Sequence, residues 1–226
     1  MPNWCYNSVT ISHPEPAIIE WLKEVCLDNS GREWWGFCNA IIPVPEELRD
    51  QRTSSHGGED AEEKDQLRAR LLEKYGYESW YDFCVNEWGT KWEVSAELFD
   101  DNLGEGGDED RYIQISFDSA WAPPVGVYRA LESKGYKVKA FYWEPGGTFC
   151  GKFEDGDDDY REYSGETSAS VRAAVGDEID DFWDIAGELA SWEEDEPEYP
   201  DAKVVVDWLE EGEQQLGLEP LFKKDK

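Results

Sequence analysis

The strongest constraint on the fold of this chain is the alternation of apolar and polar residues, with a period of two, in four separate segments. Proline and glycine punctuate the stretches between them, and helical patterns follow the first and third segments. The order β-α-β-β-α-β predicts an α+β fold, with a ferredoxin-like antiparallel sheet and the helices on one face. The four predicted strands are residues 7–12, 91–99, 112–118 and 136–143.

Mostly helical patterns fill the long stretch between the first helix and the second strand. Residues 61–75 have the mixed charges and spaced leucines of a surface helix, and residues 80–88 predict a short aromatic helix that Gly89 ends. Residues 37–44 are apolar but contain a proline, which predicts at most a strand at the edge of the sheet. We therefore expect a helical insert over about residues 46–89.

The character of the chain changes after the last predicted strands. Residues 154–226 hold 25 acidic and 6 basic residues, a local charge of −19, and they show helical patterns at 170–192 and 203–216. We expect a ferredoxin-like domain over residues 1–165 and an acidic helical region over 166–226 that packs on it.

One face of the predicted helix at 170–192 carries a stripe of carboxylates. At about 100° per residue, four acidic side chains fall within about 60° of one another, and apolar residues fill the opposite face. Helical rise spaces the carboxylates along about 16 Å, roughly one charge per 5 Å, against about 3.4 Å per phosphate along one DNA strand. The stripe, a candidate protein-binding surface, consists of Asp177, Asp181, Asp184 and Glu188.

The whole chain carries a formal net charge of −32, from 53 acidic and 21 basic residues. A surface this negative repels nucleic acid and anionic membranes and attracts basic protein surfaces. We therefore expect a partner protein with a basic surface, no direct contact with nucleic acid and no membrane association. The sequence leaves open the alternative that the charge serves only solubility or life at high salt, and it leaves the oligomeric state open.

Cysteine and histidine usage argues against disulfides, metal ions and cofactors. The five cysteines are odd in number and form no CxxC pair, and His13 and His56 lie far apart in the sequence. The acidic, glycine-containing stretches 100–110 and 155–159 have the composition of calcium sites but lack the spacing of an EF-hand. No signal peptide and no apolar run of about 18 residues is present. We expect free thiols, no metal, no cofactor and a cytoplasmic location.

Five segments of the sequence resemble those of a known family. They are MPNWCYNSVTI at the start, FCNAIIPVPEEL at 37–48, YDFCVNEWGTKWEV at 81–94, FDSAWAPP at 117–124 and FYWEPGGTFCG at 141–151. With these phrases, residues 1–151 resemble the YubB-like family of uncharacterised phage and plasmid proteins. The resemblance implies a ferredoxin-like domain and an origin in a mobile element, and it implies no catalytic residues.

The same phrases supply a second candidate site, for a ligand. In a ferredoxin-like sheet, strand ends converge, and a cluster of tryptophan with asparagine, lysine and glutamate would bind a small polar ligand or a peptide end. The alternative is that the tryptophans fill the core and the asparagines cap turns. The candidate ligand-binding residues are Asn3, Trp4, Asn7, Trp88, Lys91, Trp121 and Glu144.

Familiar catalytic motifs are absent from the sequence. It contains no GxSxG, P-loop or HExxH, so we expect no enzymatic activity. A ferredoxin-like sheet is also the scaffold of the RRM, but RNA binding needs basic surroundings that this chain lacks. The leading hypothesis is an acidic phage or plasmid protein that acts as a DNA mimic and inhibits a nucleic-acid-binding or defence protein in the host cytoplasm. The alternative is a small-ligand-binding or enzymatic module that uses the Trp/Asn/Lys/Glu cluster.

Overall fold

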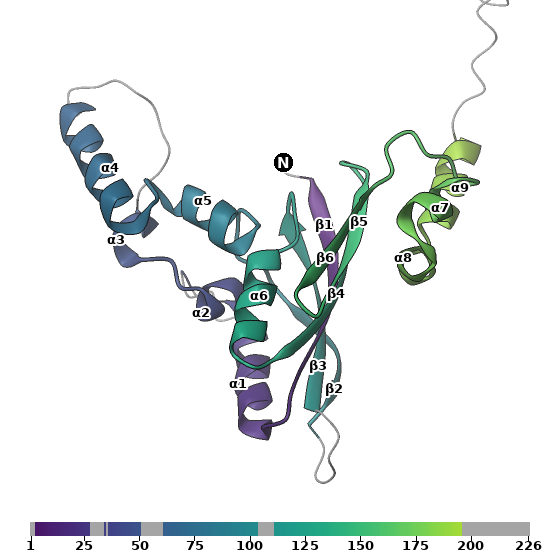
Figure 1. Ribbon diagram of the computed structural model, residues 1–226, viewed down its shortest axis with the longest axis horizontal. Helices are drawn as coiled ribbons and strands as arrows, with labels where there is room; N and C mark the ends of the chain where they lie inside the picture. Colours follow the sequence, from purple (N-terminus) through teal and green to yellow (C-terminus); the bar gives the residue numbers. More distant parts are fainter. Residues whose placement is uncertain (1–2, 28–33, 35, 51–60, 104–110, 196–226) are drawn as a thin grey trace, which may run out of the picture.

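The structure, a computed structural model, describes residues 3–27, 34, 36–50, 61–103 and 111–195. The predicted helix at 203–216 and most of the predicted loop at 100–110 lie outside these described residues. Within the described ranges, no helix is long and apolar enough to cross a membrane. The chain is a mixed α+β protein built on one open antiparallel sheet, with helices on both sides of it (Figure 1).

Six strands form the sheet in the order β2-β3-β1-β4-β5-β6, and every neighbouring pair is antiparallel. The central strand, β1, lies between β3 and β4, which places the two longest strands side by side. All four predicted strand segments contribute to this sheet, the second of them only from Glu97 onward, and β5 and β6 extend it. The strands are β1 Trp4–His13, β2 Glu97–Asn102, β3 Arg111–Ala120, β4 Lys137–Glu144, β5 Phe149–Glu154 and β6 Asp157–Glu162.

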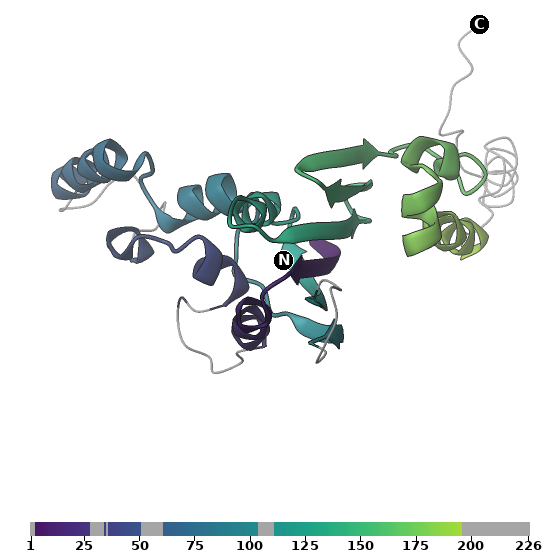
Figure 2. The same cartoon turned by 60° about the horizontal axis from the view of Figure 1, so that its bottom comes forward.

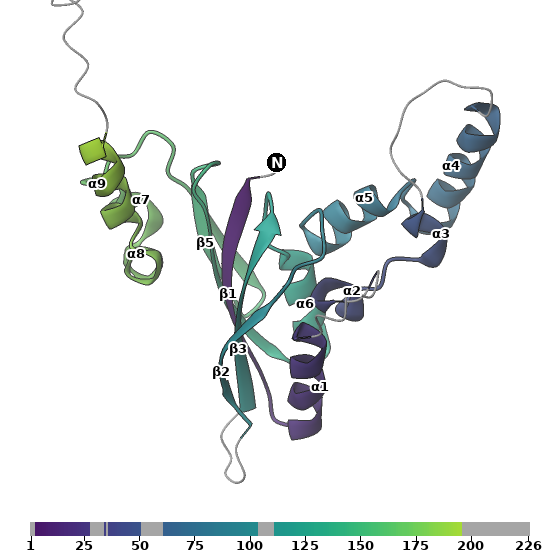
Figure 3. The same cartoon turned by 180° about the vertical axis from the view of Figure 1, so that it is seen from behind.

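Two helices, α1 (Pro16–Cys26) and α6 (Val125–Ser133), lie against one face of the sheet, which we call the helix-covered face (Figures 1 and 3). Every second residue of β1 points into the core beneath them, where Val9 and Ile11 are fully buried. Strand alternation sends the intervening side chains to the opposite side, which we call the open face. The large apolar core therefore occupies one side of the sheet only.

Helices occupy much of the stretch between α2 (Phe37–Ile41) and β2, and they lie beyond the helix-covered face (Figure 2). The long helix of this stretch has the predicted bounds, and Gly89, at a φ of 92°, ends the last short helix as expected. The helices are α3 Glu46–Arg49, α4 Ala61–Tyr75, α5 Trp80–Phe83 and the π-helix η1 Cys84–Trp88.

Two predicted strand segments are wrong in whole or in part. The expected edge strand at 37–44 is instead a short helix, α2 (Phe37–Ile41), because the half-buried Glu93 carboxylate accepts hydrogen bonds from the backbone N–H groups of Cys38 and Asn39 at its start. The predicted strand at 91–99 pairs with β3 only from Glu97 onward. Residues 91–96 are irregular instead.

A separate group of three short helices covers part of the open face, at the end of the molecule opposite α4 (Figures 1 and 3). These helices, α7 (Val171–Val175), α8 (Asp177–Trp183) and α9 (Ile185–Asp195), pack on β4 and β5 around a small second core. The ring of Phe182 stacks on that of Phe141, with centroids 4.3 Å apart and planes 9° apart.

The prediction of a single helix over residues 170–192 is therefore wrong. Gly176 has a φ of 88° and a ψ of 153°, and Asp184 is left-handed with a φ of 54°. Neither conformation continues an α-helix, so the segment divides into three. The buried carboxylate of Asp180 fixes the second break, because it accepts a hydrogen bond from the backbone N–H of Ala186 at 2.9 Å.

Candidate functional site

A group of aromatic side chains surrounds Lys91 beside the start of β1 and the end of β3. The Lys91 ammonium lies 4.6 Å from the ring centroids of Trp92 and Trp121 and 5.7 Å from that of Tyr81. The ring of Trp4 lies 6.1 Å from that of Trp92, and Tyr81 contacts Trp121 edge-on at 6.4 Å. We call these five residues the tryptophan surface, because cation–π and aromatic contacts join them into one unit.

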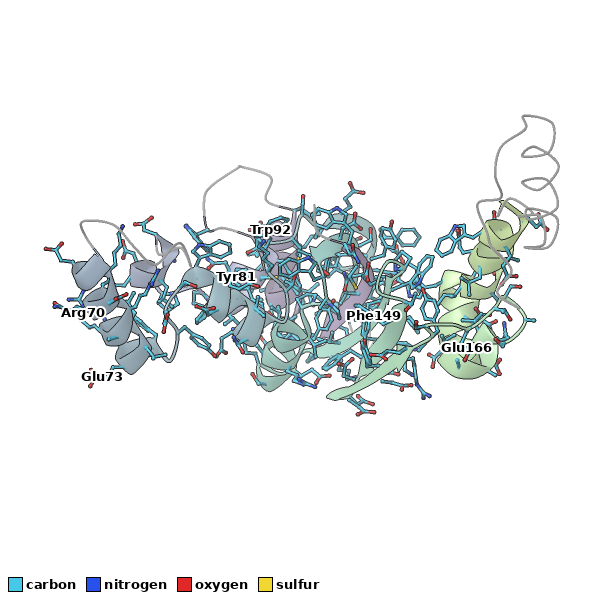
Figure 4. All side chains as sticks on the ribbon, turned by 90° about the horizontal axis from the view of Figure 1, so that it is seen from above. Arg70, Glu73, Tyr81, Trp92, Phe149 and Glu166 are labelled. Atoms are coloured by element: carbon cyan, nitrogen blue, oxygen red, sulfur yellow. The ribbon has the colours of Figure 1, made fainter. Side chains whose placement is uncertain are left out.

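The tryptophan surface faces solvent. Trp4, Trp92 and Trp121 have 42%, 37% and 42% of their areas exposed. Figure 4 shows Tyr81 and Trp92 between Arg70 and Glu73 of α4, at one end of the molecule, and Glu166, at the other. Single exposed aromatic residues are ordinary, but a contiguous group of them marks an interaction site.

Backbone contacts hold the tryptophan surface in place. Trp4 pairs with Ala120 across β1 and β3, and the Trp121 N–H donates to the Asn3 carbonyl at 3.0 Å. Trp121 has a φ of 73°, which is costly for a bulky side chain. Such backbone strain gathers at functional sites, where the surrounding structure enforces it.

Glu93 anchors the segment that carries Lys91 and Trp92. Its carboxylate accepts backbone hydrogen bonds from Cys38 at 2.7 Å, Asn39 at 2.8 Å and Val94 at 3.0 Å. Burial raises the pKa of Glu93, and these three hydrogen bonds oppose that rise. The irregular segment at 91–96 is thereby fixed to α2 instead of to a neighbouring strand.

Three of the predicted ligand-binding residues belong to the interior. Asn7 is buried; its side-chain amide donates to the Cys5 carbonyl at 2.7 Å and the Ser119 hydroxyl at 2.8 Å, and its carbonyl accepts from Tyr128. Trp88 is 1% exposed and donates to a backbone carbonyl at 2.8 Å. The buried Glu144 carboxylate accepts backbone hydrogen bonds within its own turn. These contacts are those of core and turn residues.

The structure brings together Trp4, Lys91 and Trp121 from the predicted set, with the backbone of Asn3 beside them. Sequence reasoning missed Tyr81 and Trp92. Trp92 stands next to Lys91, and a strand through both would have sent their side chains to opposite faces. Because that segment is irregular, Lys91 contacts the ring of its own neighbour. Trp88 and Trp92 flank Gly-Thr-Lys within residues 81–94, one of the segments that carry the family resemblance. This pair of tryptophans was the sequence signal that would have indicated Trp92.

The predicted carboxylate stripe is divided between two helices. Asp177 and Asp181 stand on α8, where both accept hydrogen bonds from the Arg172 guanidinium, at 2.7 and 2.6 Å. Asp184 is the left-handed residue between α8 and α9, and Glu188 follows on α9. All four side chains are exposed, but the regular spacing expected from one helix is lost.

The five cysteines are free thiols, as predicted. All are buried, and burial raises the pKa of Cys84 and of Cys150 to about 12. Thiols with such pKa values are protonated and unreactive near neutral pH. Among the described residues, no group of three or more His, Cys, Asp or Glu side chains is arranged to hold a metal ion.

Comparisons with known proteins assign the chain to no family. No family model matches it, and no curated protein matches it. Among solved structures, the chain is similar to the crystal structure of the protein Api92 from Yersinia pseudotuberculosis, which is described with the family model DUF1281. The two share 11% sequence identity over 74% of this chain and 99% of that one, with a TM-score of 0.38. A likeness this weak carries no argument about fold or function.

Proposed function

We propose that this protein is a non-enzymatic binding protein that attaches to a basic surface on another protein through the tryptophan surface. The observation that carries the proposal is the gathering of three exposed tryptophans and Tyr81 around Lys91. Tryptophan and tyrosine supply much of the energy at protein interfaces, because their large rigid rings lose little conformational entropy on binding.

The burial of several predicted ligand-binding residues favours this proposal over a small-ligand-binding module. A pocket closed by Trp4, Trp88 and Trp121 requires all three rings at the surface, but Trp88 is 1% exposed. Asn7 and Glu144, which would orient a polar ligand, use their polar atoms inside the fold. A partner protein needs only the exposed rings.

Charge supports a basic partner. The net charge of −32 attracts a basic protein at long range and repels nucleic acid. Two lysines of the open face, Lys139 and Lys152, are paired with carboxylates: both contact Glu178, at 2.9 and 2.8 Å, and Glu154, at 3.7 and 3.1 Å. In the proposal, the exposed carboxylates accelerate the encounter and the tryptophan surface holds the complex.

The biological setting belongs to the same proposal. The resemblance to the YubB-like family favours a phage or plasmid origin, with a nucleic-acid-binding or defence protein of the host as the partner. Inhibition by DNA mimicry remains the specific form of the hypothesis, with Asp177, Asp181, Asp184 and Glu188 as exposed charges. Their division between α8 and α9 removes the argument from regular spacing.

For the fold, we propose that β1, α1, β2, β3, α6 and β4 form a ferredoxin-like unit. The strand order β2-β3-β1-β4, the antiparallel pairing and the position of α1 and α6 on one face support this assignment. Residues 1–165 would then form one domain that contains the insert, and the acidic region would begin at about residue 166.

Affinity capture from host extract with matched variants tests the proposed function. Wild-type protein is compared with the triple variant Trp4→Ala, Trp92→Ala, Trp121→Ala and with Trp21→Ala, whose tryptophan on α1 is 43% exposed. We expect wild type and Trp21→Ala to retain the same basic protein and the triple variant to lose it. Retention should weaken between about 0.1 M and about 1 M salt, as the screening length falls from about 10 Å to about 3 Å.

Equal capture by the triple variant would overturn the role of the tryptophan surface. Capture of an acidic protein, or capture that salt leaves unchanged, would overturn the charge argument. The thermal unfolding temperatures of all three proteins serve as the control for folding.

A further inference from the structure

A cavity of about 320 Å³ lies between the open face of the sheet and the end of α8. Tyr6 of β1, Glu97 of β2 and Asp118 of β3 line it from the sheet, and Trp183 lines it from α8. Tyr6 lies two residues from Trp4 on the same strand, so both side chains point to the open face. The cavity therefore adjoins the tryptophan surface.

Two carboxylates share this cavity. Glu97 pairs with Ser116 across β2 and β3, and Asp118 lies two residues farther along β3, on the same face and opposite Tyr6. Both residues are exposed at the mouth of the cavity, and within the described ranges neither carboxylate forms an ion pair or a side-chain hydrogen bond. Burial, and then the charge of Glu97, raises the pKa of Asp118. Two neighbouring carboxylates without a counter-ion are an arrangement that a cation stabilises.

The remaining walls favour a cation of a particular shape. Aromatic rings attract cations through their negative faces, and both Tyr6 and Trp183 border the cavity. A guanidinium group is planar, stacks on aromatic rings and donates up to five hydrogen bonds to carboxylates, whereas an ammonium group is a compact and strongly hydrated charge.

The volume of the cavity limits the size of the group that it can bind. The volume of about 320 Å³ lies at the small end of ligand pockets, which span about 300 to 1,000 Å³. One long side chain fits such a space, and a dinucleotide or other large cofactor does not.

We propose that this cavity, lined by Tyr6, Glu97, Asp118 and Trp183, binds the guanidinium group of an arginine side chain on the partner protein. The cavity's chemistry follows from its own residues, and only the source of the arginine rests on the proposed function. A partner docked on the adjoining tryptophan surface would present the arginine beside Tyr6.

Titration with small probes tests the cavity without any partner. The probes are N-acetyl-arginine amide, its neutral isostere N-acetyl-citrulline amide and N-acetyl-lysine amide, and the readout is the NMR signal of the Trp183 indole N–H, assigned with Trp183→Phe. We expect the arginine probe to shift this signal saturably and the citrulline probe to leave it unchanged. The double variant Glu97→Gln, Asp118→Asn should weaken arginine binding roughly tenfold or more, because hydrogen bonds to charged groups are lost.

The control is Glu20→Gln, Glu24→Gln on α1, which changes the net charge equally, at two exposed carboxylates distant from the cavity. This variant should bind the arginine probe like wild type. Equal weakening in both double variants, or equal binding of arginine and citrulline, would overturn the cation site. Lysine binding as tight as arginine binding would overturn the guanidinium assignment. Failure here leaves partner capture by the tryptophan surface intact, so the two proposals fail separately.

Discussion

The two faces of the sheet use the same strands in opposite ways. On the helix-covered face, Asn7 is enclosed and its polar atoms are hydrogen-bonded inside the fold. On the open face, its neighbour Tyr6 keeps 40% of its area exposed, and Trp4 keeps 42%. Adjacent residues of one strand thus serve stability on one side and remain available for contact on the other.

The open face is itself divided. Over β4 and β5, α7, α8 and α9 cover its aromatic side chains through the stacked rings of Phe141 and Phe182. Over the start of β1 and the end of β3, the aromatic side chains stay exposed beside Lys91. In the proposed function, the partner binds the aromatic residues that the chain leaves uncovered.

The largest expected effect separates the two faces at adjacent positions of β1. Asn7→Ala leaves the Tyr128 hydroxyl and the Cys5 carbonyl without this buried partner, which should lower the free energy of unfolding by about 3 kcal/mol. On the open face of the same strand, Thr10→Ala should cost about 1 kcal/mol or less. Urea unfolding measures both, and similar losses would contradict the division between the faces.

A smaller loss is expected where α8 covers the sheet. Phe182→Ala removes the ring stacked on Phe141 and should lower stability by about 1 to 2 kcal/mol. Because α7, α8 and α9 form a separate small core, hydrogen exchange should speed up there and stay slow in β1 and β3. Trp192→Ala, on the exposed side of α9, is the control. Faster exchange spread evenly over the whole sheet would show that the two cores open together.

The smallest effect is a contrast in pH dependence between two carboxylates. Burial raises the pKa of Glu93 above its ordinary value of 4.5, so the folded chain binds its proton more tightly than the unfolded chain. Its stabilising contribution is present below the unfolded pKa and is lost as pH rises through the folded pKa. Hydrogen bonds from Lys152 and Lys139 lower the pKa of Glu178, so its contribution is present above the unfolded pKa and is lost as pH falls.

Unfolding temperatures between about pH 4 and pH 7 test this contrast. The difference between Glu93→Gln and wild type should become less unfavourable as pH rises, whereas that of Glu178→Gln should become more unfavourable. Differences that change in the same direction would contradict the assigned surroundings of one of the two carboxylates.

The alternation of apolar and polar residues predicted most of the sheet but little of the candidate site. Alternation located the strands because each has one face in the core. It failed at 91–96, where the half-buried Glu93 carboxylate joins the segment to α2 by hydrogen bonds. It also failed at 170–192, where apolar residues recur with helical spacing across two breaks, one at Gly176 and one at Asp184. A contact between residues distant in sequence decides the first case, and the backbone conformations of Gly176 and Asp184 decide the second. The period of apolar residues records neither.

Residue type alone also failed to separate the exposed tryptophans from the buried ones. Trp88 and Trp92 stand four residues apart, yet Trp88 donates a hydrogen bond inside the core and Trp92 belongs to the tryptophan surface. The end of η1 at Gly89 turns the chain between them. This one turn places Trp88 in the core and Trp92 at the surface, and the spacing of the two residues in the sequence does not indicate that difference.

Photo-crosslinking in host extract tests most directly the central claim that the tryptophan surface is the binding surface. p-Benzoylphenylalanine replaces Trp92 in one protein and Trp21 in another, two tryptophans of similar exposure, 37% and 43%, on different parts of the molecule. We expect one discrete adduct with a basic protein from position 92, lost at high salt, and no such adduct from position 21. The same adducts from both positions, or an adduct from position 21 alone, would contradict that claim.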